Sequence, residues 1–442
     1  MNLRNRLRPA QGAAAVILAA VLAACSAAPA RTGDGRAGAE RTGLHGQQLQ
    51  VAAVWSGTEQ RHFEFVLHAF TRQTGVSVRY LSAGYSVPAF LQARLAAGHP
   101  PDVAFLPQPG LLRRYASEHL LVPLDQIAGG AVEGNFDPAW RRLGSFDSRL
   151  YGVWFKAANK SLIWYNIGVF ERSGIVPPAS LAALVPAEHT LARSGTPAFT
   201  VGGADGWTLA DWFSNLYLRL AGAAQYDLLA AHRIPWTDPS VKTTLRMLAQ
   251  VLAPGLIAGG PRRALATSYQ ESVQETFARH PAAAMVFEGD FVAGVISAET
   301  SAVPGVDADV APFPAAGRAG PVVVAGGDAA VLMRRSAAGA AFIRYLASPQ
   351  AAAIWARQGG FVSPNINLGL SVYPDAIDSS IASALLQAGP NFRFSLSDLV
   401  PASFGGTEGR GMRGILQRFL LHRDVSGTAA ALEQAAREAY PR

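Results

Sequence analysis

Cysteine is almost absent from this chain, and so are the usual catalytic signatures. Cys25 is the only cysteine in 442 residues, so no disulfide can form within the chain. The nine histidines are dispersed and form neither a His-x-x-x-His nor a His-Glu-x-x-His pair, which argues against a metal centre. The sequence also contains no Gly-x-Ser-x-Gly elbow and no phosphate-binding loop.

Charge is sparse and mixed in sign. Lysine and arginine total 38 against 31 acidic residues, a formal net charge of +7. Three of the arginines, Arg4, Arg6 and Arg8, lie in the first 24 residues, which hold no acid, so the rest of the chain carries +4. The other basic residues form scattered pairs instead of a basic face with interleaved aromatics, so we predict no nucleic-acid binding.

Long apolar runs are missing beyond the N-terminus. The three arginines precede an apolar run at 12–24 that is short for a membrane span, so residues 1–24 are predicted to be a secretory signal. Leu22-Ala23-Ala24-Cys25 resembles the lipobox of bacterial lipoproteins, which implies cleavage before Cys25 and lipidation of it. An ordinary signal peptide with a chance cysteine is the alternative. Residues 25–48 are predicted to include the lipidated cysteine and a flexible tether.

A strand–helix pattern fills residues 49–110. Apolar or alternating runs predict strands at 49–54, 76–80 and 102–106, and helical stripes lie between them. Such a unit predicts a parallel sheet with ligands bound beyond the carboxyl ends of its strands. The loops Trp55–Gln60 and Pro107–Gly110 lie at that edge.

The length predicts two lobes, because 442 residues exceed one ordinary core. The first crossing between lobes is predicted at 150–166 and the last at 359–365. A strand at 198–201 leads into a glycine loop and a helix that Thr208–Asp211 would open as a capping box. Residues 310–314 are predicted to begin the return to the first lobe.

Several segments together resemble a known family. They are Trp55–Gln60, Phe70–Val78, Arg94–Ala104, Pro107–Gly110 and Ser348–Ala353. The chain from Leu49 onward resembles the extracellular solute-binding proteins of ABC importers, in the family that carries sugars and maltose-like oligosaccharides. His99 departs from the pattern, where relatives more often have Asn.

The resemblance implies a fold, a place and a function. The fold is α/β and periplasmic-binding-protein-like, with two lobes that each hold a mostly parallel sheet flanked by helices, joined by hinge strands. Lobe one would be 49–155 plus 315–358, and lobe two 160–312 plus 362–442. The protein would be a monomer, lipid-anchored to the outer face of the cytoplasmic membrane. It would capture a carbohydrate, expected to be an oligosaccharide, by lobe closure, deliver it to permease subunits and need no cofactor.

Sugar recognition needs flat apolar faces and charged or amide groups. The residues predicted to contact the ligand are Trp55, Glu59, Gln108, Asp205, Trp207, Glu288, Asp290, Phe361, Asn365 and Phe404. Each also has a structural interpretation: Trp55 could be a core aromatic at a strand end, Glu59 a first-turn carboxylate facing the helix dipole, and Asp205 a helix cap. Trp154 and Lys156 at the first hinge are further candidates, whereas Trp212 is more typical of a core.

Two other functions stay open. A glycerophosphodiester ligand would need an Arg or Lys fork, but the predicted loops carry aromatics and acids. A secreted carbohydrate-active enzyme could use Glu59 and Glu288 as acid and base at a defined separation. We disfavour the enzyme because these residues would lie on two lobes that move.

Overall fold

The structure is a computed structural model that describes residues 43–84, 87–317, 322–406 and 410–440. The predicted signal segment, Cys25 and the tether up to residue 42 lie outside the described residues. The described residues from Leu44 onward form one compact unit. Within the described ranges, no helix has both the length and the apolar character needed to cross a membrane.

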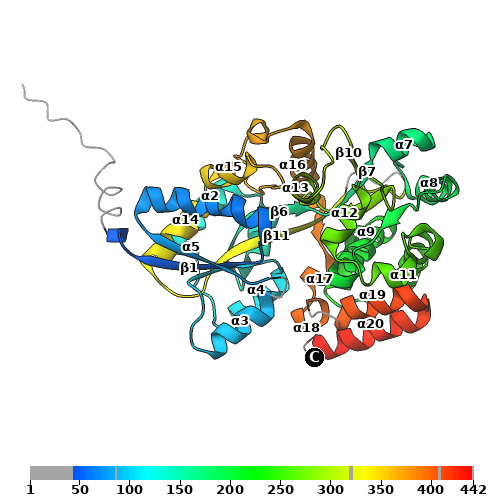
Figure 1. Cartoon of the computed structure of the whole chain (residues 1–442). Coiled ribbons are helices and arrows are strands. Elements are labelled where there is room, and N and C mark those ends of the chain that lie inside the picture. The colour runs from blue at the N-terminus through cyan, green and yellow to red at the C-terminus, as the bar shows by residue number, and fades with distance from the viewer. Residues whose placement is uncertain (1–42, 85–86, 318–321, 407–409, 441–442) are drawn as a thin grey trace, which may run out of the picture. The chain divides into compact units, whose positions relative to one another are not determined.

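The first sheet contains the predicted strand–helix unit. Its order is β12-β11-β3-β1-β2, and β6 also pairs with β11 (Figure 1). The strands are β1 Gln48–Ala53, β2 Ser77–Ser82, β3 Val103–Leu106, β6 Gly152–Asn159, β11 Val323–Leu332 and β12 Phe392–Phe394. β1 runs parallel to both β2 and β3, which confirms the predicted parallel arrangement.

Helix α2, Gly57–Thr74, shows why the unit folds this way. Its stripe of Phe63, Val66, Leu67 and Phe70 is buried. Gly75 ends the helix with φ 74°, a left-handed conformation that glycine adopts without steric cost. The other helices around this sheet are α3 Val87–Ala96, α4 Pro109–Ser117, α5 Asp125–Asn135, α6 Pro138–Leu143, α14 Ala337–Leu346, α15 Pro349–Ala356 and α16 Ala376–Ala388. We call this sheet and its helices the first lobe.

The second sheet has the order β10-β7-β9-β8. Its strands are β7 Leu162–Asn166, β8 Phe199–Thr200, β9 Met285–Glu288 and β10 Ala308–Pro312. Only β8 and β9 are parallel, while β7 runs antiparallel to both β9 and β10. This sheet is therefore less parallel than expected. Residues 308–312 also stay in it instead of starting the return to the first sheet.

Helices surround this second sheet to form what we call the second lobe (Figure 1). They are α7 Ile167–Ser173, α8 Leu181–Arg193, α9 Trp207–Ala230, α10 Pro239–Val251, α11 Gly260–Ala264, α12 Tyr269–Thr276, α13 Val292–Glu299, α17 Leu396–Leu399, α18 Ala402–Gly405, α19 Gly411–His422 and α20 Val425–Ala439. α9 is kinked at Gly222, where φ is 82°.

The predicted capping box at Thr208–Asp211 is wrong. α9 already begins at Trp207, with Gly206 as its N-cap. The Thr208 hydroxyl donates to the Gly202 carbonyl at 2.6 Å, and Asp211 pairs with Lys160. Both side chains therefore have partners other than the first backbone N–H groups of the helix.

The segments that connect the lobes lie side by side. Between β6 and β7, the Lys160 N–H donates to the Val324 carbonyl at 2.9 Å. The Val324 N–H donates to the Ser161 hydroxyl at 2.8 Å, and the Ser395 N–H donates to the Ala325 carbonyl at 3.0 Å. Three chain segments are thus tied together where one lobe meets the other.

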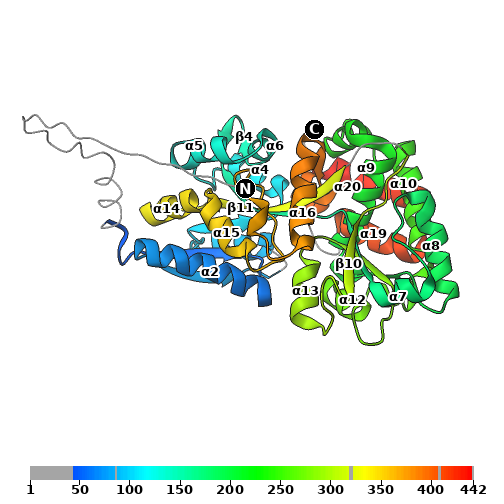
Figure 2. The ribbon, with the colours of Figure 1, turned by 90° about the horizontal axis from the view of Figure 1, so that it is seen from above.

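The chain between 361 and 394 packs with the first lobe. α16 lies against β6 and β11 (Figure 2), and β12 pairs with β11. From Leu396 onward, buried side chains again belong to the hydrophobic core of the second lobe. The limits given for the two lobes stay predictions, but this packing favours a last crossing near residue 395.

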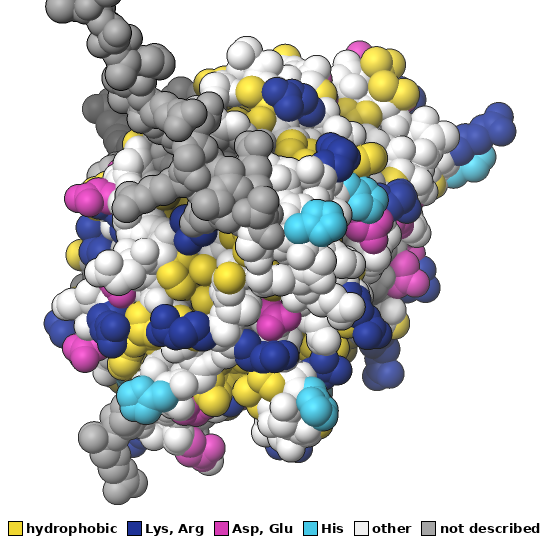
Figure 3. Space-filling view, turned by 90° about the vertical axis from the view of Figure 1, so that its left-hand side faces the viewer, with side chains coloured by type: hydrophobic (Ala, Val, Ile, Leu, Met, Phe, Trp, Pro, Cys, Tyr) yellow, Lys and Arg dark blue, Asp and Glu magenta, His cyan; other side chains and the backbone are white. Residues whose placement is uncertain are grey.

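On the side shown in Figure 3, basic, acidic and apolar side chains of the described residues are interspersed.

Candidate ligand-binding cleft

A cavity of about 250 Å³ lies between the two lobes. The first lobe lines it with the start of α2, the loop before α4, and parts of β6, β11 and α15. The second lobe contributes the starts of α9 and α12, part of α13, and residues of α17 and α19. Both loops expected to face a ligand, after β1 and after β3, therefore border this cleft.

Lys156 forms the centre of the first-lobe wall. Its side chain is 5% exposed, and its ammonium binds the Glu59 carboxylate. The nitrogen also lies 5.4 Å from the Trp355 ring centroid and 5.9 Å from that of Phe291. Burial alone would lower the pKa of Lys156, but the surrounding carboxylates, Glu59 foremost, raise it. Lys156 is therefore a buried, charged donor.

Two buried aspartates accompany Lys156. Asp328 stands opposite it in the β6–β11 register, and burial raises the Asp328 pKa to about 6 against the opposing pull of Lys156. Asp290 accepts a hydrogen bond from the Asn159 N–H at 2.7 Å. Burial raises its pKa to about 7. Of the two, only Asp328 lines the cleft, and a hydroxyl or charged donor that enters there would stabilise its ionised form.

The second-lobe wall is aromatic. Trp207, Tyr269 and Phe291 form a trio with ring centroids 5.2 to 6.0 Å apart. The Asp205 carboxylate holds the start of α12 by accepting from the Tyr269 N–H at 2.7 Å. Gly206 precedes Trp207 with φ 69°, and a Cβ there would lie 3.1 Å from the Cβ of Arg413. The turn therefore requires glycine to place the first ring of the trio.

A second lysine links the aromatic wall to the connecting segments. The Lys160 ammonium lies 3.0 Å from Asp211 and 3.4 Å from Asp398, and 5.3 Å from the Trp207 centroid. Arg413 approaches the other oxygen of Asp398 at 4.0 Å. Burial would lower the Lys160 pKa, but Asp211 and Asp398 raise it. Two cations thus face the cleft with carboxylates beside them.

Glu288 lies behind this group. Burial and the nearby Asp211 raise its pKa well above the ordinary value. No described side chain donates a hydrogen bond to either of its oxygens. In the part of the chain that the structure describes, no cluster of three or more His, Cys, Asp or Glu side chains is arranged to hold a metal ion.

The structure places the ten predicted contact residues in two groups. Four line the cleft: Trp55, Glu59, Gln108 and Trp207. Trp55 is only 1% exposed and packs on Phe63 and Trp355, so it forms the floor more than the wall.

The other six are not part of the lining: Asp205, Glu288, Asp290, Phe361, Asn365 and Phe404. Phe361 stacks on Trp355 at 5.0 Å, and Phe404 packs on Trp236 at 5.1 Å. The Asn365 amide donates to the Ala347 carbonyl at 3.3 Å. Trp154 and Trp212 are both buried in the cores.

Several cleft residues had no counterpart among the predictions: Lys160, Tyr269, Phe291, Asp328, Asp398 and Arg413. Two of them had a signal in the sequence. Lys160 sits in the polar break of the predicted first crossing, and Asp328 follows two glycines that interrupt an apolar strand. Asp398 lies in the four-residue helix α17 and Arg413 in α19, and neither position has a sequence feature that indicates a cleft.

The sequence of this chain is similar to those of known binding proteins. Residues 56–353 match the family described as bacterial extracellular solute-binding protein. The osmoprotective compounds-binding protein GgtB of Synechocystis sp. is 31% identical over 374 residues, covering 83% of this chain and 88% of that protein. The alpha-glucosides-binding periplasmic protein AglE of Rhizobium meliloti is 30% identical over 378 residues, covering 82% and 81%.

Solved structures share the fold. The bacterial solute receptor AcbH, described as having an exclusive preference for β-D-galactopyranose, superposes with a TM-score of 0.79 at 21% identity, covering 89% of this chain and all of that one. UgpB from Mycobacterium tuberculosis, in complex with glycerophosphocholine, gives 0.68 at 18% identity, covering 89% and 98%. The chain therefore belongs to the family of bacterial extracellular solute-binding proteins.

Proposed function

We propose that this protein is the ligand-capturing component of an ABC importer and binds a carbohydrate in the cleft between its lobes. Ligand contacts to both lobes favour a closed form, which a membrane permease recognises. The protein is a monomer, and a lipid on Cys25 holds it at the outer face of the cytoplasmic membrane. The names of the relatives, with alpha-glucosides and osmoprotective compounds, support a carbohydrate or a similar polyhydroxylated solute.

One observation carries the proposal: the cleft brings aromatic faces of the second lobe opposite charged groups of the first lobe. Trp207 and Tyr269 offer faces to a sugar ring. Glu59, Lys156 and Asp328 offer charge-assisted hydrogen bonds to hydroxyl groups, which are stronger than neutral ones. A ligand that spans the cleft would use both sets at once.

The cleft favours ligands rich in hydroxyl donors. The Gln108 side-chain oxygen faces the cleft, is buried, and accepts no hydrogen bond from the described residues. The volume of about 250 Å³ falls below the roughly 300–1,000 Å³ of pockets for drug-sized ligands. It therefore suits a mono- or disaccharide better than a longer oligosaccharide.

A glycerophosphodiester is the second candidate, because the cleft holds Lys156, Lys160 and Arg413 and UgpB shares the fold. Each of these cations already lies beside a carboxylate, which leaves less positive charge for a phosphate. A glycosidase has less support, because it would need two carboxyl groups on either side of the bond that it cleaves, and Glu288 does not line the cleft with Glu59.

The test is thermal unfolding of the purified full chain against mono- and oligosaccharides and glycerophosphodiesters. A ligand at 100 times its Kd adds about 2.7 kcal/mol to the free energy of unfolding. We expect stabilisation by at least one small sugar, which chromatography recovers unchanged. Stabilisation by a phosphodiester alone, or chemical conversion of the sugar, would contradict the proposal.

A further inference from the structure

We propose that Asp398 is a specificity-determining residue that keeps the cleft selective for neutral ligands and against phosphorylated ones. This inference rests on the proposed function, because it concerns which ligands the same cleft accepts.

Asp398 stands between two cations from different parts of the chain. One of its oxygens lies 3.4 Å from the Lys160 ammonium, and the other lies 4.0 Å from the Arg413 guanidinium. Lys160 comes from the segment between β6 and β7, and Arg413 from α19. All three side chains line the cleft, and Asp398 is only 6% exposed. The carboxylate is thus built into the wall.

Asp398 is the carboxylate that the two cations share. Lys160 pairs with both Asp211 and Asp398, whereas Arg413 pairs with Asp398. The described residues leave Arg413 no carboxylate within 4 Å other than Asp398. Without the Asp398 charge, Lys160 would keep Asp211 as its partner, and Arg413 would keep no carboxylate partner among the described residues.

The donors beside Asp398 are of the kind that binds phosphate. A guanidinium presents a planar fork to phosphate oxygens, and an ammonium adds a point charge. The Nε of Arg413 is buried and donates to no described residue. Lys160 lies beside it above the Trp207 ring. A phosphodiester in the wild-type cleft would meet the Asp398 carboxylate at this place, and like charges repel it.

The test is the Asp398→Asn variant, which keeps the shape and removes the charge. Calorimetric titrations would use glycerophosphocholine, inorganic phosphate and the best neutral sugar from the panel. We expect the variant to bind glycerophosphocholine or phosphate at least tenfold more tightly than the wild type, with an affinity that falls as salt rises. Sugar affinity should change much less.

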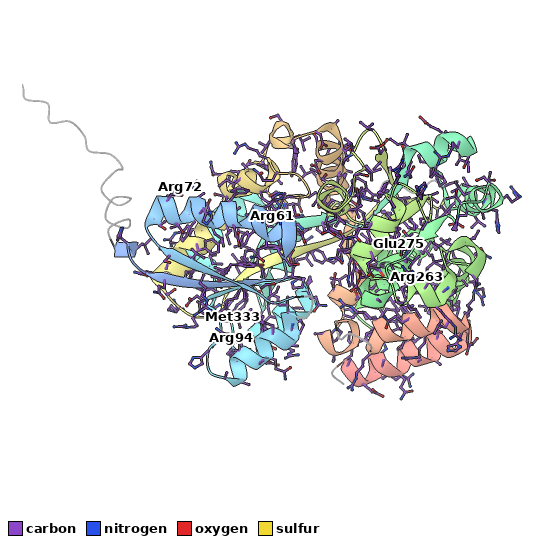
Figure 4. The ribbon with its side chains drawn as sticks, in the orientation of Figure 1. Arg61, Arg72, Arg94, Arg263, Glu275 and Met333 are labelled. Atoms are coloured by element: carbon purple, nitrogen blue, oxygen red, sulfur yellow. The ribbon has the colours of Figure 1, made fainter. Side chains whose placement is uncertain are left out.

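The control variant removes the carboxylate charge from an arginine–carboxylate ion pair outside the cleft. Arg263 and Glu275 form an ion pair outside the cleft lining, and both are labelled on the second lobe in Figure 4. Glu275→Gln should leave phosphate binding as in the wild type. A gain equal to that of Asp398→Asn would mean that total charge decides, and the proposal would fail.

Two further outcomes would overturn the inference. The first is wild-type protein that binds glycerophosphocholine as tightly as any sugar, a result that needs no variant to fold. The second is Asp398→Asn protein with a normal unfolding transition and no gain for phosphate. If instead no sugar binds the wild type, the proposed function fails, while the gain for phosphate still tests Asp398 by itself.

Discussion

At the scale of single residues, Lys156 and Glu59 form an ion pair in which the lysine is buried and the glutamate is partly exposed. The Lys156 side chain is 5% exposed and that of Glu59 is 39% exposed. Lys156 also compensates Asp290 and Asp328, both buried. Removal of the lysine leaves buried carboxylates without a cation, whereas removal of the glutamate leaves a lysine that keeps two other carboxylates.

We therefore expect Lys156→Met to be far more costly than Glu59→Gln. Loss of one partner of a buried ion pair costs about 3–5 kcal/mol, whereas a half-exposed pair contributes about 0–1 kcal/mol. Urea unfolding of both variants at pH 7 would measure the difference. Equal losses of unfolding free energy would show that Lys156 does not act as the counterion of the two aspartates.

Some cleft residues can be predicted from the sequence and others cannot, because the direction of a side chain depends on what it packs against. Glu59 and Trp207 lie in the first turns of α2 and α9. Each helix follows a strand, and such positions were expected to border a cleft, as both residues do. Phe361 and Phe404 looked similar in the sequence but turn into the cores. The direction of a loop side chain depends on partners such as Trp355 and Trp236, which are remote in sequence or identifiable only from packing.

At the scale of elements, α8 contains an unusual core position. Its buried stripe is Leu181, Leu184, Glu188 and Leu191. Both carboxyl oxygens of Glu188 lack a hydrogen-bond partner among the described residues. Burial raises the pKa of Glu188 to about 9 from an ordinary 4.5. The helix therefore carries a neutral acid where an apolar residue would fit.

This position makes stability depend on pH. Because the folded-state pKa is raised, the folded protein binds more protons than the unfolded one between pH 4.5 and about 9. The contribution of Glu188 is fully present below pH 4.5 and is lost as the pH rises through about 9. We expect Glu188→Leu to remove this loss and to raise the unfolding free energy at pH 8 by about 1–3 kcal/mol, the cost of a buried polar group without a partner.

Urea unfolding from pH 5 to pH 9 would check this expectation. Glu133→Leu is the control, since the Glu133 side chain is 79% exposed and its loss should leave the pH profile unchanged. A Glu188→Leu profile that runs parallel to the wild type would refute the assigned role of the buried acid.

Helices and strands were easier to predict from the sequence than the pairing of one strand with another. The apolar stripe of α2, its glycine end, and α14 at 337–346 follow from local pattern. The pairing of β12 with β11 joins residues about 70 positions apart along a three-residue strand, and no local pattern marks it. Local pattern therefore gives no indication that residues 392–394 pair with the first sheet.

At the scale of the whole molecule, the segments that connect the two lobes determine how one lobe can rotate relative to the other. Lys160, Val324 and Ser395 belong to three segments held by adjacent hydrogen bonds, so a rotation of one lobe would bend all three together. A ligand that contacts both walls should shift the population toward the closed form. Small-angle scattering should show a smaller radius of gyration with the bound sugar, and an unchanged radius with sugars that do not bind. A radius that stays constant on saturation would contradict capture by closure.

The most direct test of the account is calorimetric titration of the best sugar into wild type, Trp207→Ala and Phe65→Ala. Trp207 lines the cleft, whereas Phe65 is a 49% exposed aromatic on the outer face of α2. We predict at least a tenfold loss of affinity for Trp207→Ala, or about 1.4 kcal/mol, and wild-type affinity for Phe65→Ala. Wild-type affinity in both variants would show that the sugar binds outside the aromatic wall of the cleft.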